Sequence, residues 1–282
     1  MSFAYPFALA LAAALLDVTL GYPAALARRI GTPTQWLSVW HGIIEVAADG
    51  WSGPGALILF LAPVAVGGAA IAEFLPAGPI GFTVTALLIS AFCGRQSLDA
   101  RARAVAGAWE TDGPYEAFGA AEALGADEAD PRLVRAAAAA VAARFADEVA
   151  VPTVFVVIGG LPGIAVCRAL TIAARASRES RDATAFDGAV TTFASWTIAP
   201  AARAGAFLLA LAAGGRAAAW RAVGAPATRP TAPAEATLLA ALGEPQREDP
   251  AYLRRAIALY RRAAAAEFCA LAALTLVTAL AI

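Results

Sequence analysis

Residues 145–168 read FADEVAVPTVFVVIGGLPGIAVCR, a segment in which two acids precede an apolar run. Asp147 and Glu148 come first, three glycines and a proline interrupt the run at residues 159–163, and Arg168 closes it. Glycine and proline both weaken a helix where they gather. A broken apolar segment flanked by charges predicts a polar site at the boundary of a membrane rather than a plain core helix.

The composition of the whole chain points to the same environment. Of its 282 residues, 60% are hydrophobic and 15% are charged. A typical soluble domain is nearer to about half apolar and about a quarter charged. The formal net charge of -1 gives no indication of a nucleic-acid partner. We therefore expect a polytopic membrane protein whose main surroundings are the lipid bilayer.

Four to six apolar segments approach the roughly 20 residues that span a bilayer. They are residues 3–20, 55–75, 78–93, 149–174, 186–213 and 264–282. We expect an all-α polytopic integral membrane protein in which residues 1–282 form a single membrane domain. Six simple crossings would place the arginines of residues 175–182 outside, against the usual cytoplasmic bias of such loops. Either residues 149–174 and 186–213 enter the membrane and return, or this short loop tolerates the wrong side.

Two segments differ from the apolar runs. Residues 94–146 carry many charges, and Leu98, Ala102 and Val105 recur in them at helical spacing. They predict a helical insertion outside the bilayer, on the cytoplasmic side because of its arginines. Residues 214–250 are rich in proline, alanine and arginine, and we expect them to be mostly irregular.

Five charged or titratable residues carry the site hypotheses, each beside a simpler interpretation. Asp147 is a candidate metal or amine ligand, or an N-cap of the helix that follows. Asp17 is a site acid near the membrane surface, or an acid that reaches the interface from the end of a span. Arg168 and Arg203 can bind phosphate through forked donors, or place their charges at the membrane edge. His41 is expected to be an interfacial polar residue.

Several short blocks occur in a fixed order along the chain. They are Leu16-Asp17-Val18-Thr19-Leu20-Gly21-Tyr22-Pro23, Ser97-Leu98, Arg103-Ala104-Val105, Asp147 to Pro152, Gly159-Gly160-Leu161-Pro162-Gly163, Pro200-Ala201-Ala202-Arg203 and Leu259-Tyr260-Arg261-Arg262-Ala263. In order and spacing they resemble the CobD/CbiB family, the adenosylcobinamide-phosphate synthases. The resemblance covers most of the chain and implies a polytopic protein of the bacterial inner (cytoplasmic) membrane.

The resemblance also implies an activity of the ligase type. Members of that family form an amide between adenosylcobyric acid and aminopropanol phosphate in an ATP-dependent reaction. It implies ATP and Mg²⁺ as cofactors and a corrinoid as substrate. The residues implied are Asp17 and Asp147 as catalytic acids, Asp147 also as a metal ligand, and Gly21, Pro23, Ser97, Arg168 and Arg203 as substrate- or phosphate-binding residues.

The chain departs from the family at several polar positions. The replacements are Thr32 for a histidine, Arg144 and Thr171 for asparagines, Ala174 for an aspartate, and Ala194-Ser195 for paired aspartates. They motivate a second hypothesis, a non-catalytic paralogue that serves as a membrane scaffold or as a subunit among other membrane subunits. A transporter is a weaker third hypothesis, because broken helices also occur in transporters, but no inverted repeat is visible.

Overall fold

The computed structural model shows an all-helical chain. It describes residues 5–21, 29, 31–47, 50–111, 114–126, 133–179, 184–226, 229–245 and 250–281. In these ranges every regular element is a helix, which confirms the expected all-α class.

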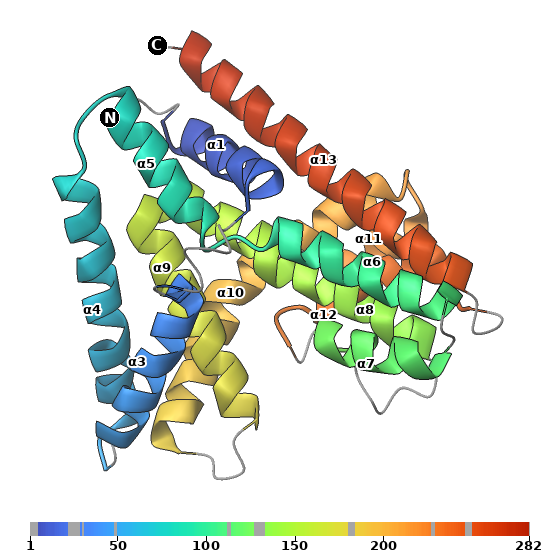
Figure 1. Ribbon diagram of the computed structural model, residues 1–282, viewed down its shortest axis with the longest axis horizontal. Coiled ribbons are helices and arrows are strands. Elements are labelled where there is room, and N and C mark those ends of the chain that lie inside the picture. The colour runs from blue at the N-terminus through green and yellow to red at the C-terminus, as the bar shows by residue number, and fades with distance from the viewer. Residues whose placement is uncertain are drawn as a thin grey trace. The chain divides into compact units, whose positions relative to one another are not determined.

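Figure 1 shows the described helices in chain order by colour. The first are α1 (Tyr5–Thr19), α3 (Pro33–Ala47), α4 (Gly53–Phe74) and α5 (Pro79–Ser90). Next come α6 (Arg95–Thr111), α7 (Pro114–Leu124), α8 (Leu133–Phe145), the π-helical turn η1 (Ala146–Ala150) and α9 (Val151–Glu179). The last are α10 (Ala185–Ala212), α11 (Ala217–Val223), α12 (Ala232–Leu242) and α13 (Pro250–Leu280).

Four helical stretches in the described part of the chain are long and apolar enough to cross a membrane. They are Gly53–Phe74, Leu133–Arg178, Ala185–Ala212 and Ala251–Leu280. Helices α1 and α5, with 15 and 12 residues, are shorter than the roughly 20 that a crossing needs. The chain is therefore a polytopic membrane protein, at the lower end of the expected four to six segments.

The chain divides into two compact units, and each combines segments that are distant in sequence. Unit 1 consists of Met1–Cys93, Pro152–Ala199 and Leu271–Ile282, and unit 2 of Gly94–Val151 and Pro200–Ala270. We describe each unit by itself. The expected single membrane domain stays a prediction.

Unit 1 packs its helices through small residues. Helix α1 lies against α5, and the core between them includes Leu9, Ala13 and Ile89. A Cβ atom added at Gly53 would lie 2.2 Å from the carbonyl oxygen of Ala185. Such close backbone contacts are typical of helices packed within a membrane. There, moving an apolar side chain from lipid into the protein interior gains little hydrophobic free energy.

Unit 1 also contains the backbone break expected in residues 159–163. Gly160 in α9 has φ 57° and ψ -138°, far from helical values. Pro162 contributes to the break because it cannot donate a main-chain hydrogen bond to a preceding turn. Whether the two flanking segments cross the bilayer or re-enter it stays a prediction.

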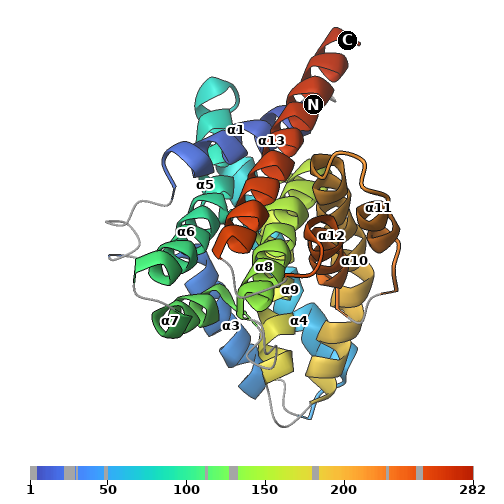
Figure 2. The same ribbon diagram turned by 90° about the vertical axis from the view of Figure 1, so that its right-hand side faces the viewer.

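Unit 2 contains residues 94–146, whose place outside the bilayer stays a prediction. Helices α6 and α7 pack against each other, and α8 contacts α7 and α12 (Figure 2). Leu98, Ala102 and Val105 are fully buried in α6, so the periodicity of the insertion is confirmed. Helix α8 continues through η1 into α9. The candidate span Leu133–Arg178 therefore begins within the residues that were expected outside the bilayer.

Residues 214–250 differ from the irregular structure expected of them. They contain α11 and α12 among their described residues. Pro233 lies in the first turn of α12, where its missing N–H costs the helix nothing. The helix start is further held by Glu235, which accepts a hydrogen bond from Thr231 Oγ1 (2.9 Å) and pairs with Arg229 (3.0 Å). Proline content alone therefore misjudged this segment.

Candidate functional site

The π-helical turn η1 places two acids at the end of α8. Pro152, four residues after Glu148, has no N–H to donate to the Glu148 carbonyl oxygen. That oxygen instead accepts a hydrogen bond from the main-chain N–H of Gly94 (3.3 Å), just before α6. The loss of helical bonding around a proline thus lets the start of α6 pack directly on η1. Single π-helical turns inside α-helices occur frequently at functional sites.

The Glu148 carboxylate lies between two arginines of unit 2. Its Oε2 accepts a hydrogen bond from Arg101 Nη2 at 2.6 Å, and its Oε1 accepts one from Arg144 Nη1 at 3.1 Å. The Glu148 side chain is 11% exposed, Arg144 18% and Arg101 30%. Charge-assisted bonds in such a partly buried setting are stronger than those of an exposed pair. We call these three side chains the Glu148 cluster.

The Glu148 cluster is fixed from three elements. Arg144 Nε donates to the carbonyl oxygen of Leu124 at the end of α7 (3.0 Å). Arg101 Nη2 also donates to Ser97 Oγ (3.3 Å), so the predicted site residue Ser97 joins the cluster. Gly94 lies against it, because a Cβ atom there would be 2.7 Å from Glu148 Oε2. The carboxylate therefore has one well-defined position.

A second ion pair holds the N-terminal end of α6. Arg95 Nη2 donates to Glu267 Oε1 of α13 at 2.9 Å, and both side chains are almost fully buried. The guanidinium also lies 4.8 Å from the ring centroid of Phe268, a cation–π distance. Tyr260 Oη donates to the main-chain oxygen of Arg95 (3.5 Å). These contacts position the first turn of α6, one and a half turns before Arg101.

Asp147 and Arg203 are both in unit 2 but the structure does not bring them together. Asp147 is partly exposed on η1. Helix α10 approaches η1 at Gly205, where a Cβ atom would lie 3.1 Å from Cβ of Ala150. Arg203 precedes Gly205 by two residues, about 200° around the helix, and is exposed. Its side chain therefore extends away from the face that contacts η1.

Asp17 and Gly21 lie in unit 1, at the end of α1. Asp17 is 3% exposed, on the same face as the core residues Ala10 and Ala13. Gly21 has φ 58°, and its N–H donates to the carbonyl oxygens of Leu16 (3.2 Å) and Asp17 (3.1 Å). A residue with positive φ that closes a helix in this way is usually glycine. Gly21 thus has a role as a helix terminus, and Pro23 lies outside the described residues.

Arg168 is also in unit 1 and is buried, not at an exposed edge. Its Nε donates to the carbonyl oxygen of Phe92 at 2.5 Å. Phe92 follows the end of α5, where carbonyl groups have no helical donors and a cation is favourable. The described contact makes Arg168 a link between α9 and the end of α5.

His41 differs from the interfacial residue that was expected. It is 5% exposed and packs between the rings of Phe60 (5.7 Å) and Phe186 (5.6 Å). Burial lowers the pKa of the imidazole, and the carboxylates of Glu45 and Asp187 oppose this shift without reversing it. The buried Nε2 has no hydrogen-bond partner among the residues that the structure describes. Burial inside unit 1 therefore favours the neutral form of His41.

The Mg²⁺ that the family resemblance implies requires oxygen ligands. Among the described residues, no group of three or more His, Cys, Asp or Glu side chains could enclose a metal ion. Glu148 already receives two guanidinium groups. Mg²⁺ is often held by only one or two carboxylates together with phosphate oxygens and water. Asp147, partly exposed beside the Glu148 cluster, meets that smaller requirement.

Sequence reasoning selected Asp147 and considered Glu148 only as part of a helix cap. One signal was present, because Arg144 and Glu148 are spaced i,i+4 on a helical segment. The contact with Arg101 joins residues 47 positions apart. No local pattern in the sequence reports such a pairing, so the centre of the cluster could only be found in the structure.

Comparison with known proteins gives a partial but consistent result. The chain is 27% identical over 168 residues to each of two curated sequences of the cobalamin biosynthesis protein CobD of Rhodobacter capsulatus. The match covers 55% of this chain and 52% of each relative, so the chain spans about half the length of the curated relatives that it matches. No family model matches the chain. No solved structure matches it either.

The match to CobD agrees with the resemblance that the sequence blocks indicated. It supports the relationship at low identity and leaves the roles of individual residues untested. This helical membrane protein is a distant relative of the CobD proteins of cobalamin biosynthesis.

Proposed function

We propose that this protein acts in cobalamin biosynthesis, in the bacterial inner membrane, as a divergent amide-forming enzyme related to CobD. Its substrates would be a corrinoid carboxylic acid and a phosphorylated amino alcohol, with ATP supplying the energy for amide formation. The distant relationship to CobD supports the pathway. The reaction itself rests on the resemblance of the sequence blocks and on the polar site in unit 2.

The observation that carries the proposal is the arrangement around η1. The Glu148 cluster holds two guanidinium groups in fixed positions, and Ser97 and the partly exposed Asp147 are attached to the same elements. Fixed guanidinium groups bind phosphate and carboxylate well. A preorganised group of this kind is what a site for phosphorylated and carboxylic substrates requires.

Within this proposal the two neighbouring acids have different roles. Glu148 positions Arg101 and Arg144, since both of its oxygens are engaged by them. Asp147 is the acid that reaches the substrates, and it would contribute one ligand to the Mg²⁺ that accompanies ATP. The two acids differ in burial: as a whole residue Glu148 is 8% exposed, whereas Asp147 is partly exposed. We therefore assign the substrate contact to Asp147.

Genetic complementation tests the proposed function. A bacterial strain that lacks its adenosylcobinamide-phosphate synthase and depends on cobalamin is supplied with cobyric acid and without cobinamide. We expect the wild-type gene to restore growth, Glu148→Gln to reduce it strongly and Glu122→Gln to leave it intact. Glu122 is an exposed acid of α7 in the same unit and serves as the matched control. Absence of growth with a well-expressed, membrane-inserted wild-type protein would overturn the proposal.

A specific observation favours the second candidate, a non-catalytic membrane scaffold. Arg144 stands at a position where the resemblance implies an asparagine, and here it neutralises Glu148 and binds the end of α7. A balanced ion cluster can serve stability alone. The scaffold requires a partner, so mild-detergent extraction followed by affinity purification should then recover a stable complex. Recovery of this chain alone, together with positive complementation, would exclude it.

A further inference from the structure

Helix α3 has three distinct faces, although it is too short to cross a bilayer. Its 15 residues extend about 22 Å, less than the hydrocarbon thickness of about 30 Å. One face packs on α4, where Trp40 Nε1 donates to the carbonyl oxygen of Phe60 at 3.0 Å. His41 and Ile44 are buried on the same face. This face is fully accounted for by contacts within unit 1.

A second face of α3 is apolar and exposed. Trp36, Val39, Ile43 and Val46 recur at intervals of three and four residues, and their exposed fractions are 61%, 64%, 52% and 80%. We call these four side chains the α3 stripe. A continuous row of large apolar side chains of this kind is costly in water and marks an interaction surface.

The third face of α3 is polar. Around the helix it lies between the α3 stripe and the face that packs on α4. It carries Gln35, Ser38 and Glu45, again at intervals compatible with one side of a helix. A helix with a continuous apolar row next to a polar row, and with a tryptophan in the apolar row, has the pattern of helices that lie in the interfacial layer of membranes.

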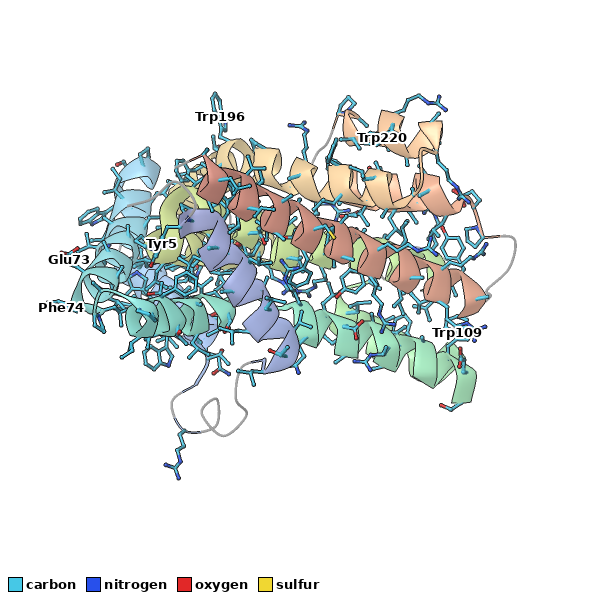
Figure 3. All side chains as sticks on the ribbon, turned by 90° about the horizontal axis from the view of Figure 1, so that it is seen from above. Tyr5, Glu73, Phe74, Trp109, Trp196 and Trp220 are labelled. Atoms are coloured by element: carbon cyan, nitrogen blue, oxygen red, sulfur yellow. The ribbon has the colours of Figure 1, made fainter. Side chains whose placement is uncertain are left out.

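The neighbouring helix indicates what covers the α3 stripe. Helix α4 lies alongside α3 in both views of the ribbon (Figures 1 and 2) and is a candidate span of which only 17% of the apolar window is buried. It exposes Ile58 and Val66, and at its end Phe74, 89% exposed, projects away from the helix (Figure 3). In a membrane protein this face meets lipid. Helix α3, which carries the α3 stripe, packs on this candidate span.

We propose that the α3 stripe is covered by lipid acyl chains, so that α3 is embedded in the membrane without crossing it. Gln35, Ser38 and Glu45 then face the headgroups and water, while His41 and Trp40 remain packed on α4. The inference concerns membrane contact and does not depend on the proposed catalytic function.

Spin labelling in nanodiscs tests this directly with the full-length protein. In a background in which Cys93, Cys167 and Cys269 are replaced by alanine, a nitroxide is attached at Val39→Cys or Ile43→Cys. Ser38→Cys on the polar face is the matched control, and Val66→Cys on α4 is the lipid-facing reference. Collisions with oxygen and with a water-soluble nickel complex are compared. We expect both stripe labels to favour oxygen several-fold, as Val66→Cys does, and Ser38→Cys to favour nickel.

Two outcomes would overturn the proposal: nickel accessibility at the stripe equal to that at Ser38→Cys, or protection from both reagents, which would indicate a protein cover. A second measurement does not depend on cysteine replacement. Brominated lipids should quench less of the total fluorescence in Trp36→Phe than in the wild type, and Trp109→Phe in α6 should show no such loss. Equal quenching in the wild type and Trp36→Phe would contradict lipid contact.

Discussion

Units 1 and 2 organise their polar groups in different ways. In unit 2 the ends of α6 and α8 are held by ion pairs, the Glu148 cluster and the buried pair of Arg95 with Glu267. In unit 1 the helices meet through glycine contacts such as Gly53, a backbone break at Gly160 and single links such as Arg168 to Phe92. Unit 1 contains α4, a candidate span of which only 17% of the apolar window is buried.

The two kinds of packing have different physical requirements. Helices in lipid gain little from apolar burial, so close backbone approach and satisfied main-chain groups decide their packing. A buried ion pair is stable only when the attraction and hydrogen bonds between its partners offset the desolvation of both charges. Removal of one partner is then strongly destabilising, because it leaves the other charge buried and unpaired. We therefore expect the stability of unit 2 to depend on a few charged side chains, and that of unit 1 to depend on backbone geometry at several positions.

Removal of the central carboxylate of unit 2 should have the largest effect. Glu148→Ala leaves the partly buried guanidinium groups of Arg101 and Arg144 without their shared anion. We expect the free energy of unfolding to fall by about 2–4 kcal/mol, discounted from a fully buried pair because Arg101 is partly exposed. Chemical denaturation in mild detergent measures the change, and hydrogen exchange should show the loss of protection in α6 and α8.

The matched control is Glu122→Ala, which removes an exposed acid from α7 in the same unit. It should change the free energy of unfolding by no more than about 0.5 kcal/mol. Equal stability of Glu148→Ala and Glu122→Ala would show that the ion cluster does not hold unit 2 together.

A backbone change should have the next largest effect, and in unit 1. Gly160→Ala places a Cβ atom at φ 57° and ψ -138°, a region essentially closed to other residues. Apart from the adjoining backbone of α9, no described atom lies within 4 Å of the new Cβ, so the cost is backbone strain of about 1–3 kcal/mol. Gly159→Ala is the matched control, because its surroundings are equally open and its φ is not positive.

Gly159→Ala should be neutral, or stabilising by up to about 1 kcal/mol through the better helix propensity of alanine. Thermal unfolding of the two variants by circular dichroism provides the comparison. If Gly160→Ala were as stable as Gly159→Ala, the break in α9 would be a consequence of packing rather than a requirement of the backbone.

The smallest expected effect is a pH dependence from His41. Its pKa is lowered in the folded protein, chiefly by burial. As the pH falls through the ordinary histidine pKa of about 6.5, the unfolded chain therefore takes up a proton more readily than the folded chain. Stability should decrease toward acidic pH, and His41→Gln should reduce that decrease when melting is followed between pH 8 and about pH 5. A larger acid sensitivity in His41→Gln would contradict this assignment.

The fold was largely accessible from the sequence, and particular residues show why. The long apolar runs predicted the spans, and the spacing of Leu98, Ala102 and Val105 predicted a helix whose buried face is now observed. The Gly-Pro cluster at residues 159–163 predicted a backbone break, found at Gly160. These features depend on local sequence. Residues 214–250 contain helices that their content of proline, alanine and arginine did not indicate, because a proline in the first turn is compatible with a helix.

The candidate site was less accessible, because its contacts are not local. Arg101 reaches Glu148 from 47 residues away, and Arg95 reaches Glu267 from 172 residues away. Gly21 matched a family block, and the structure shows that its conformation closes α1. Block matching cannot separate residues that maintain the fold from residues that act on substrates. That separation requires burial and contact geometry.

The most direct test of the account is the rate of amide formation by purified protein in nanodiscs. Cobyric acid, aminopropanol phosphate, ATP and Mg²⁺ are supplied, and the product is detected by its mass. Wild-type protein and Asp147→Asn are compared at equal amounts of folded protein, verified by their melting temperatures. The account predicts product with the wild type and a loss of at least about 100-fold with Asp147→Asn at unchanged melting temperature. Undiminished product formation by Asp147→Asn, or none by well-folded wild type, would contradict it.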